Sequence, residues 1–488
     1  MKSPLRTLAV VATLSFSHYL QAGIVTNSQD GGPGSLRAAI AAAINGEMIT
    51  FAQNLNGATI TLVSGELTIT GKQLAIDAST LAAGVTLSGN DSHRIFLIIG
   101  NANVTLRKLA IRDGSAPAPS PGGGAIAVAE SHLKMFDCSV RDSFATYNGG
   151  GILLALGTIA SFDRCRVVGN VASSLGFGGG VFISGATSTV FRNCLISDNS
   201  NPLGGGLSVS NSSPSFINCT IEGNSGGGVR NNSTADPVLA NCIIWGNFTS
   251  GFESTASQQV GNFNSSNPVI SFSLIQGASG PGSFGDGNST TWGSGNLNGA
   301  LNPKFALEMA APFPPFAAGD LPLLVSSPAL NVGSNLADIG SMDLAGNPRI
   351  KDTTVDLGAF EGGFVTFGLL HPLLAPNDDA NQNGASNLQE YGMGFNPSST
   401  TYSGVLPALT RNDGMLSLTF NQRSNALDVV MIMETSIDLV SPWTVMMEGA
   451  HFSSPTSNAT TSDRNLIKLT LNSSDPKRFY RQAFTQGN

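Results

Sequence analysis

A repeat of glycine triplets and cysteines constrains the fold of this chain more than any other feature. Five Gly triplets occur, starting at Gly122, Gly149, Gly178, Gly204 and Gly226. Five cysteines keep the same beat, at Cys138, Cys165, Cys194, Cys219 and Cys242. A period of roughly 20–50 residues is typical of solenoids, in which each repeat buries its apolar face only against its neighbours. The sequence therefore predicts a stack of similar coils.

Further columns become visible when the repeats are aligned on their cysteines. Two residues after each cysteine stand Val140, Val167, Ile196, Ile221 and Ile244, and three residues before stand Met135, Phe162, Phe191, Phe216 and Leu239. An offset of two keeps side chains on one face of a strand, so an offset of three requires a bend. Five residues after the cysteine, four repeats carry Asn: Asn170, Asn199, Asn224 and Asn247. We expect inner stacks of Phe, Ile and Cys, and a turn lined by Asn amides that bond from coil to coil.

The cysteines allow two interpretations. Export of the chain would permit disulfides, and adjacent coils bring Cα atoms within disulfide range. However, all five cysteines occupy one inward column among aliphatic residues, where a thiol behaves as a small buried hydrophobe. We expect free thiols, with two bridges between neighbouring coils as the alternative.

The rest of the chain divides into further segments. Irregular strands over 59–111 predict earlier coils, and an Ala-rich helix over 36–45, with Ser35 as N-cap and Gly46 as its stop, is expected to cover the open end. We assign 1–22 to a signal peptide, 23–363 to a parallel β-helix whose last coils and closure fall in 301–363, 364–400 to a linker, and 401–488 to a small β-sandwich.

The composition, the net charge and the N-terminal residues indicate which partners and which location to expect. Charged residues make up 11% of it and the net charge is −8, which argues against a nucleic-acid partner. Lys2 and Arg6 precede an apolar stretch from Leu8 to Phe16, so cleavage near Ala22 is expected, with a short N-terminal anchor as the alternative. No later segment is apolar and long enough to be a transmembrane helix. We expect a monomeric chain that is secreted or held at the cell surface or outer envelope of a bacterium.

One family resemblance rests on local motifs. Gly123-Gly124-Ala125-Ile126 is similar to half of the repeat in polymorphic outer-membrane-protein-like β-helices, 25–37 resembles the entry segment of large bacterial surface β-helix proteins, and 343–361 resembles their closing segment. Over roughly residues 24–363, the resemblance implies a right-handed β-helix, export and an adhesive or surface role. The F-x-x-N half of that repeat is one residue short here, as in Phe191-Arg192-Asn193, and no C-terminal autotransporter barrel is evident, which argues against insertion in the outer membrane.

Candidate catalytic residues are few. Lyases and hydrolases built on β-helices need acidic residues at matching positions in neighbouring coils, and the regular repeats show no such cluster. Asp142 and Asp198 share one offset, but they are two coils apart with Gly169 between them. The most polar grouping is 91–94, Asp-Ser-His-Arg, expected as a solvated turn. Convergence of Asp91, Arg94, Asp113 and Asp142 in one groove would favour an enzyme.

One motif predicts a metal. Residues 379–390 fit D-x-[DN]-x-[DN]-G-x5-E, the calcium loop of EF-hand type. The predicted ligands are Asp379, Asn381, Asn383, the carbonyl of Ala385, Asn387 through water, and Glu390. Only two of these are charged, so a modest affinity is expected. A metal-free Asn/Gly turn is the alternative.

The sequence leaves three functions open. The first is a non-catalytic, adhesin-like protein that binds glycan or protein ligands along its solenoid face. The second is a polysaccharide lyase or glycoside hydrolase that acts on an acidic or plant-type polysaccharide. The third is a structural spacer of the cell envelope. The regular repeat without an acidic cluster favours the first.

Overall fold

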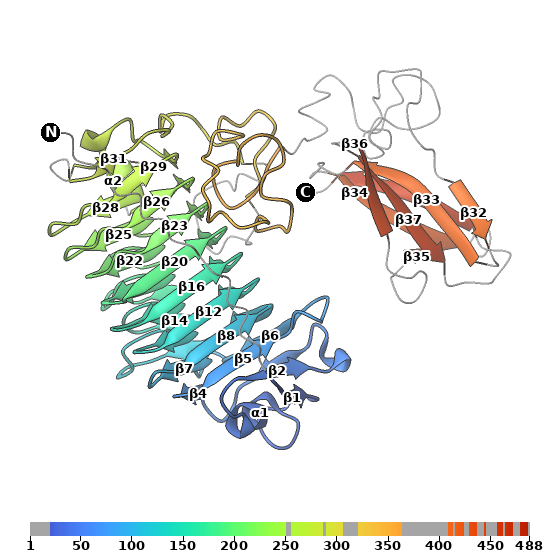
Figure 1. Ribbon diagram of the computed structural model, residues 1–488, viewed down its shortest axis with the longest axis horizontal. Helices are drawn as coiled ribbons and strands as arrows, with labels where there is room; N and C mark the ends of the chain where they lie inside the picture. The colour runs from blue at the N-terminus through green and yellow to red at the C-terminus, as the bar shows by residue number, and fades with distance from the viewer. Residues whose placement is uncertain are drawn as a thin grey trace, which may run out of the picture. The chain divides into compact units, whose positions relative to one another are not determined.

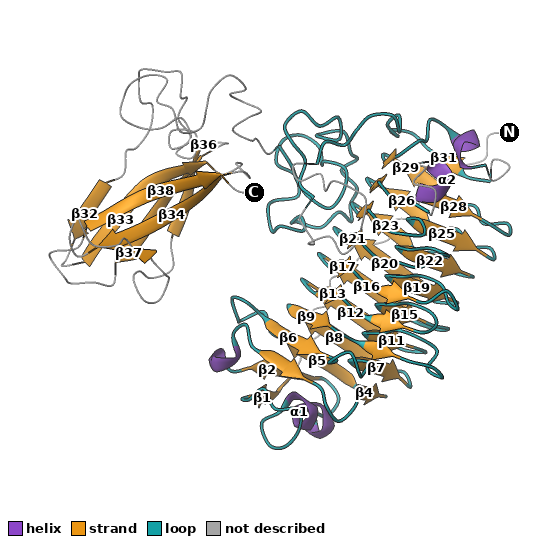
Figure 2. Ribbon diagram, turned by 180° about the vertical axis from the view of Figure 1, so that it is seen from behind, coloured by secondary structure: helices purple, strands orange, loops and turns teal. Residues whose placement is uncertain are grey.

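A computed structural model describes residues 20–249, 255–285, 289–305 and 321–363, together with the strands between 408 and 486. Contacts divide the chain into two units, one from the N-terminus to 303 with 309–319 and 328–361, and one comprising 304–308, 320–327 and 362–488. The first unit is a parallel β-helix, as the repeat predicts. Figures 1 and 2 show its coils stacked along one axis.

Three parallel sheets form the sides of the helix, and from β4 to β30 the chain passes through them in the repeating order sheet C, sheet A, sheet B. Sheet A contains β1 (Leu20–Val25), β2 (Glu47–Phe51), β5 (Gln73–Asp77), β8 (Asn103–Arg107), β12 (His132–Phe136), β16 (Ile159–Asp163), β20 (Ser188–Arg192), β23 (Ser215–Ile217), β26 (Val238–Ala240), β29 (Val269–Ser271) and β31 (Thr291–Trp292). Sheet B contains β3 (Thr59–Thr61), β6 (Val85–Ser88), β9 (Leu109–Arg112), β13 (Ser139–Arg141), β17 (Arg166–Val168), β21 (Leu195–Ser197), β24 (Thr220–Glu222), β27 (Ile243–Trp245) and β30 (Leu274–Ile275). Sheet C contains β4 (Leu67–Thr70), β7 (Phe96–Ile99), β11 (Ile126–Val128), β15 (Ile152–Leu154), β19 (Val181–Ser184), β22 (Leu207–Ser210), β25 (Val229–Asn232) and β28 (Val260–Asn262).

Short elements complete the coils. A small sheet D follows sheet B in three coils, with β10 (Ser115–Ala116), β14 (Phe144–Ala145) and β18 (Val171–Ala172). The helical elements are α1 (Leu36–Ala42), η1 (Gln53–Leu55), α2 (Ala256–Gln259) and η2 (Pro281–Phe284). Ser35 caps α1 through its side chain, which accepts from the amide of Ala38, and α1 buries Leu36 and Ile40 at the N-terminal end of the stack. The predicted helical cap is confirmed, although the helix ends earlier than Gly46.

The predicted inward columns form the core. The rings of Phe162 and Phe191 stack with centroids 4.3 Å apart, and Phe216 continues the stack at 5.2 Å. All five cysteines are buried free thiols, as expected, and burial raises the pKa of Cys138, Cys165, Cys194 and Cys219 well above the usual range. The bend predicted between Phe and Cys is a single residue with left-handed backbone, such as Asn193 at φ 54°.

The predicted Asn turn is a continuous ladder of buried amides. Asn170, Asn199 and Asn224 each donate from Nδ2 to Oδ1 of the Asn in the next coil, at 3.0, 3.0 and 2.7 Å. In four of the five triplets the third glycine packs against this ladder: Gly151, Gly180, Gly206 and Gly228. A Cβ at Gly180 would lie 2.8 Å from Cγ of Asn199, so the triplets leave the space that the amides occupy. The glycine triplets and the ladder asparagines therefore pack against each other at one corner of the β-helix.

The segment after the last coils does not behave as expected. Residues 328–361, here called the return segment, add no strand to the three sheets in the part of the chain that the structure describes, so they are not further coils. Instead the return segment runs back beside earlier coils: Asn241 exchanges two hydrogen bonds with the backbone of Ser334, and the amide of Ala359 donates to Thr220. The Gly/Ser/Asn-rich residues 276–300, which precede it, contain β31.

The C-terminal strands form two antiparallel sheets. One has the order β32 (Ala408–Asn412), β33 (Met415–Arg423), β37 (Arg464–Leu471), β36 (Thr456–Thr461), and the other has the order β35 (Thr444–Val445), β34 (Val429–Ser436), β38 (Phe479–Gln486). All of these strands lie within 401–488, the range that the sequence analysis assigns to a small β-sandwich.

Candidate functional site

The polar grouping at 91–94 lies where the chain leaves sheet B and enters sheet C. Arg94 stands two residues before β7, and Glu66 stands directly before β4 in the preceding coil. Since β4 and β7 pair in parallel, the two side chains meet although 28 residues separate them in sequence. Arg94 Nη1 donates to Glu66 Oε2 at 2.8 Å.

Arg94 is held in one plane by four acceptors. Besides Glu66, its Nε donates to the carbonyl of Gly123 at 2.9 Å, and its Nη2 donates to the carbonyl of Gly122 at 2.9 Å and to the hydroxyl of Ser120. The Arg94 side chain is only 9% exposed, whereas that of Glu66 is 29% exposed. The guanidinium is thus a fixed wall, and the carboxylate reaches solvent.

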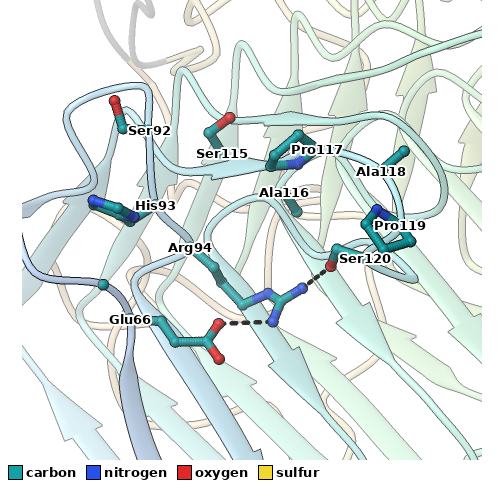
Figure 3. A pocket seen from close by; sticks show the side chains of 11 residues that line it. Glu66, Ser92, His93, Arg94, Ser115, Ala116, Pro117, Ala118, Pro119 and Ser120 are labelled. Carbon is teal, nitrogen blue, oxygen red and sulfur yellow. Dashed lines mark hydrogen bonds and ion pairs between the residues drawn. The ribbon is translucent and has the colours of Figure 1, made fainter.

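A cavity of about 450 Å³ opens beside this ion pair. Its walls come from the coil of β4, from 92–94 and from 115–120, which covers β10 and the loop after it (Figure 3). His93 and Ser92 lie across from the loop, and Pro117 and Pro119 are exposed on it. Among the lining residues, Glu66 carries the single carboxyl group, and its Oε1 accepts no hydrogen bond from the described residues. The cavity therefore offers hydroxyl, imidazole and carboxylate groups. The charges of Arg94 and Glu66 balance each other, so the ion pair adds no net charge.

Asp91, Arg94, Asp113 and Asp142, whose convergence in one groove would favour an enzyme, come together only in part. Asp113 and Asp142 occupy equivalent left-handed turns in neighbouring coils, and the amide of Asp91 donates to the Asp113 carbonyl at 2.8 Å. Each carboxylate has its own arginine: Asp113 lies 3.3 Å from Arg112, and Asp142 lies 3.0 Å from Arg141. The Arg94 side chain lies apart from these two turns, at the wall of the cavity, where it pairs with Glu66. This corner is a pair of charged turns and not an acidic groove.

The turn residues differ in their electrostatics. Burial raises the pKa of Asp142, an effect that Arg141 opposes. Burial alone raises the pKa of Asp198 to about 7. Gly169 separates the two aspartates, and a Cβ there would meet Asp142 Oδ1 at 2.8 Å. Asp142 and Asp198 thus remain separate groups, as their spacing in the sequence predicts.

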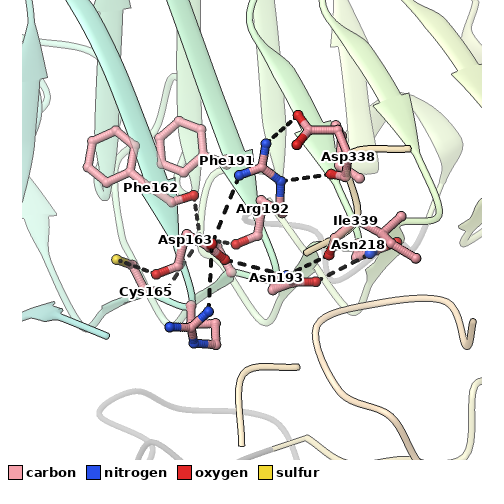
Figure 4. A network of polar contacts seen from close by, with 12 residues as sticks. Phe162, Asp163, Cys165, Phe191, Arg192, Asn193, Asn218, Asp338 and Ile339 are labelled. Atoms are coloured by element: carbon pink, nitrogen blue, oxygen red, sulfur yellow. Dashed lines mark hydrogen bonds and ion pairs between the residues drawn. The ribbon is translucent and has the colours of Figure 1, made fainter. Parts of the chain in front are cut away.

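A second polar network lies on the corner between sheets A and B (Figure 4). Arg192 lies between Asp163, at 3.9 Å, and Asp338 of the return segment. Asn218 donates to Asn193, which in turn donates to the carbonyl of Ile339 at 2.9 Å. Burial raises the pKa of Asp163 above its usual value, and the nearby Arg164 and Arg192 oppose only part of this increase. These contacts fasten the return segment to the coils, so we interpret the network as structural.

The predicted calcium ligands cannot be placed. Residues 379–390, including Asp379, Asn381, Asn383, Ala385, Asn387 and Glu390, lie outside the described residues. In the part that is described, no group of three His, Cys, Asp or Glu side chains is arranged to hold a metal ion. No helix among the described residues is long and apolar enough to cross a membrane.

Sequence reasoning singled out His93 and Arg94 but missed their partners. Glu66 and Ser120 carry no local motif, and they reach Arg94 only through the stacking of coils. An alignment of the early strands on sheet C, of the kind that the cysteines allow later in the chain, would have placed Glu66 beside Arg94.

A comparison with protein families agrees with the β-helix fold. The family described as "Right handed beta helix region" matches residues 54–214 and 150–298, which together span half of the chain. A search of the curated proteins gives no match. Among solved structures, the crystal structure of pectate lyase Pel9A aligns with 71% of this chain and 98% of its own, at 16% identity and a TM-score of 0.39. The family match confirms the predicted right-handed coiling, and the chain belongs to the right-handed β-helix family.

Proposed function

We propose that this protein is an exported, non-catalytic binding protein that holds a glycan chain in the cavity beside Arg94. The observation that carries the proposal is a preorganised polar cavity whose lining includes one carboxyl group, already paired with an arginine. Glycoside hydrolysis in most families needs two carboxylates, so this cavity is better suited to hold a sugar than to cleave it.

The chemistry of the lining fits sugar hydroxyls. A hydroxyl both donates and accepts, and Glu66 Oε1, Ser92, His93 and Ser115 offer both kinds of partner at the wall of the cavity. The buried guanidinium of Arg94 is already oriented, so binding costs little side-chain entropy. The exposed rings of Pro117 and Pro119 add apolar surface for a sugar face.

A glycan panel tests this proposal. The full chain is titrated calorimetrically with neutral and acidic oligosaccharides, and the same mixtures are assayed for new reducing ends and unsaturated ends. We expect binding without products. Products would contradict the proposal and favour the polysaccharide lyase or hydrolase, and a panel without any binding would favour a structural spacer.

A matched pair of variants locates the site. Glu66→Gln removes the carboxylate that borders the cavity, and Asp142→Asn removes a carboxylate from a similar ion pair outside it. We expect at least a tenfold loss of glycan affinity in Glu66→Gln and none in Asp142→Asn. Equal affinities in the two variants would place the ligand elsewhere.

The calcium loop remains part of the proposal. Its spacing supports binding of one Ca²⁺ by residues 379–390, which would order the connection to the C-terminal strands. Calorimetric titration with calcium, compared with the Glu390→Gln variant, tests it. Absence of heat at millimolar calcium in the unmodified chain would remove the assignment.

A further inference from the structure

Arg230 occupies an unusual place on the outer face of sheet C. It belongs to β25, and its partner in the next coil is Gly261 of β28. Because Gly261 has no side chain, the arginine can extend over the next coil, where its guanidinium carbon lies 3.9 Å from the centre of the Phe263 ring. A Cβ at Gly261 would come within 3.1 Å of that ring. The arginine is thus held flat against an aromatic face.

This arginine lacks the partner that its counterparts have. Eight arginines of the described chain form ion pairs with Asp or Glu: Arg37, Arg94, Arg107, Arg112, Arg141, Arg164, Arg192 and Arg349. Arg230 forms none with the described residues, and its Nε is buried without a hydrogen-bond acceptor. Its two terminal nitrogens, Nη1 and Nη2, are not among the buried atoms and form no hydrogen bond with the described residues, so they are open to an acceptor from a ligand.

Space for that acceptor is present. A cavity of about 110 Å³ borders Arg230 and Phe263, and Thr249, Ser257 and Gln258 add polar groups to its wall. Since about 10–15 Å³ of such space already holds one water, the cavity has room for a group of several heavy atoms, such as an oxyanion. No carboxylate is among the lining residues of the described chain.

We propose that Arg230 and this cavity form a subsite for one oxyanion, a carboxylate or a sulfate, carried by a glycan chain long enough to span the five coils from β7 to β25, about 24 Å at roughly 4.8 Å per coil. The planar guanidinium fork matches either group with two parallel hydrogen bonds, which a lysine could not provide. Stacking on Phe263 fixes the plane of the fork before the ligand arrives. The carrier of the anion rests on the proposed glycan function, and the anion site itself rests on Arg230.

The experiment compares oligosaccharides that share one backbone and differ in a single group: uncharged, carboxylated as a hexuronate, and O-sulfated. Calorimetry on the full chain is expected to show at least tenfold tighter binding of one acidic form than of the uncharged form. Arg230→Gln abolishes this difference, and Arg230→Lys restores only part of it. Arg141→Gln changes the net charge equally at a distant ion pair and keeps the full difference.

The outcomes separate the two proposals. Equal binding of acidic and uncharged forms, or a preference that survives in Arg230→Gln, overturns the anion subsite and leaves the glycan function standing. If no oligosaccharide binds, the glycan function fails, and titration with sodium sulfate and sodium acetate then decides the subsite: anion binding that Arg230→Gln removes supports it, and no anion binding overturns it. Thermal melting of each variant shows that the fold is intact.

Discussion

Two columns of asparagine run along this β-helix, on different corners, and they work in different ways. The ladder after sheet B, which contains Asn170, Asn199, Asn224 and Asn247, is closed on itself: each amide bonds to the next, and Gln259 completes the last bond at 2.7 Å. The column between sheets A and B contains Asn193, Asn218 and Asn241. Its members bond largely to the return segment, and Oδ1 of Asn218 is buried without a partner.

The difference follows from backbone geometry. Asn193, Asn218 and Asn241 have left-handed φ values of 54°, 51° and 55°, a conformation that Asn tolerates better than most residues. Their side chains are free to receive another segment. The ladder asparagines are absent from the left-handed residues and point inward, where only their own neighbours can satisfy them. The ladder joins neighbouring coils to one another, whereas Asn193 and Asn241 of the other column bind the return segment.

The largest effect is expected from breaking the closed ladder. Asn199→Ala leaves the backbone amide of Asn170 without its acceptor in the core, and it removes two further buried hydrogen bonds, one from Asn170 Nδ2 and one to the Val167 carbonyl. We expect a loss of about 3 kcal/mol of unfolding free energy, since each orphaned buried group is costly. Urea denaturation measures it. A loss no larger than that of Asn241→Ala would contradict the distinction between the columns.

A second substitution tests the space around the ladder. Gly180→Ala places a methyl group 2.7 Å from the carbonyl of Gly206 and 2.8 Å from Asn199, and should cost about 2 kcal/mol through overpacking. Gly31→Ala is the control, because nothing lies within 4 Å of its Cβ position. Similar melting temperatures for the two variants would show that the triplet is not needed to accommodate the amides.

The recruiting column predicts a local effect. Asn241→Ala removes hydrogen bonds of 2.9 and 2.8 Å to Ser334, so the return segment should lose about 1 kcal/mol of local stability. Hydrogen exchange followed by mass spectrometry should show faster exchange in 328–361 and unchanged protection in β20, β23 and β26. Faster exchange in those strands as well would mean that the return segment is part of the cooperative core.

The last prediction concerns pH. Burial raises the pKa of Asp198 from its usual 3.8 to about 7, so the folded state keeps its proton where the unfolded chain loses it. The aspartate therefore destabilises the fold progressively from about pH 4 to pH 7, after which the effect is constant. Asp198→Asn should be more stable than the unmodified chain at pH 8 and equal to it near pH 4. A difference independent of pH would refute the shift.

The two columns also show how far the sequence could be interpreted. The ladder and the Phe and Cys stacks were predictable because the same residue types recur at one offset in successive coils, and the helical cap was predictable because Ser35 marks its start. The role of Asn193, Asn218 and Asn241 was not, because it depends on a segment 93 to 146 residues later. Glu66 and Arg230 were missed for a related reason: each acquires its meaning from residues of a neighbouring coil that no local motif marks.

The measurement that tests the account most directly is a crystal structure of the full chain with the tightest-binding oligosaccharide of the panel. We expect an intact sugar in the cavity, in contact with Glu66, His93 and Ser115, with the guanidinium of Arg94 unmoved. A sugar seated on the outer face of sheet A, or a cleaved product in the cavity, would contradict the proposed binding function.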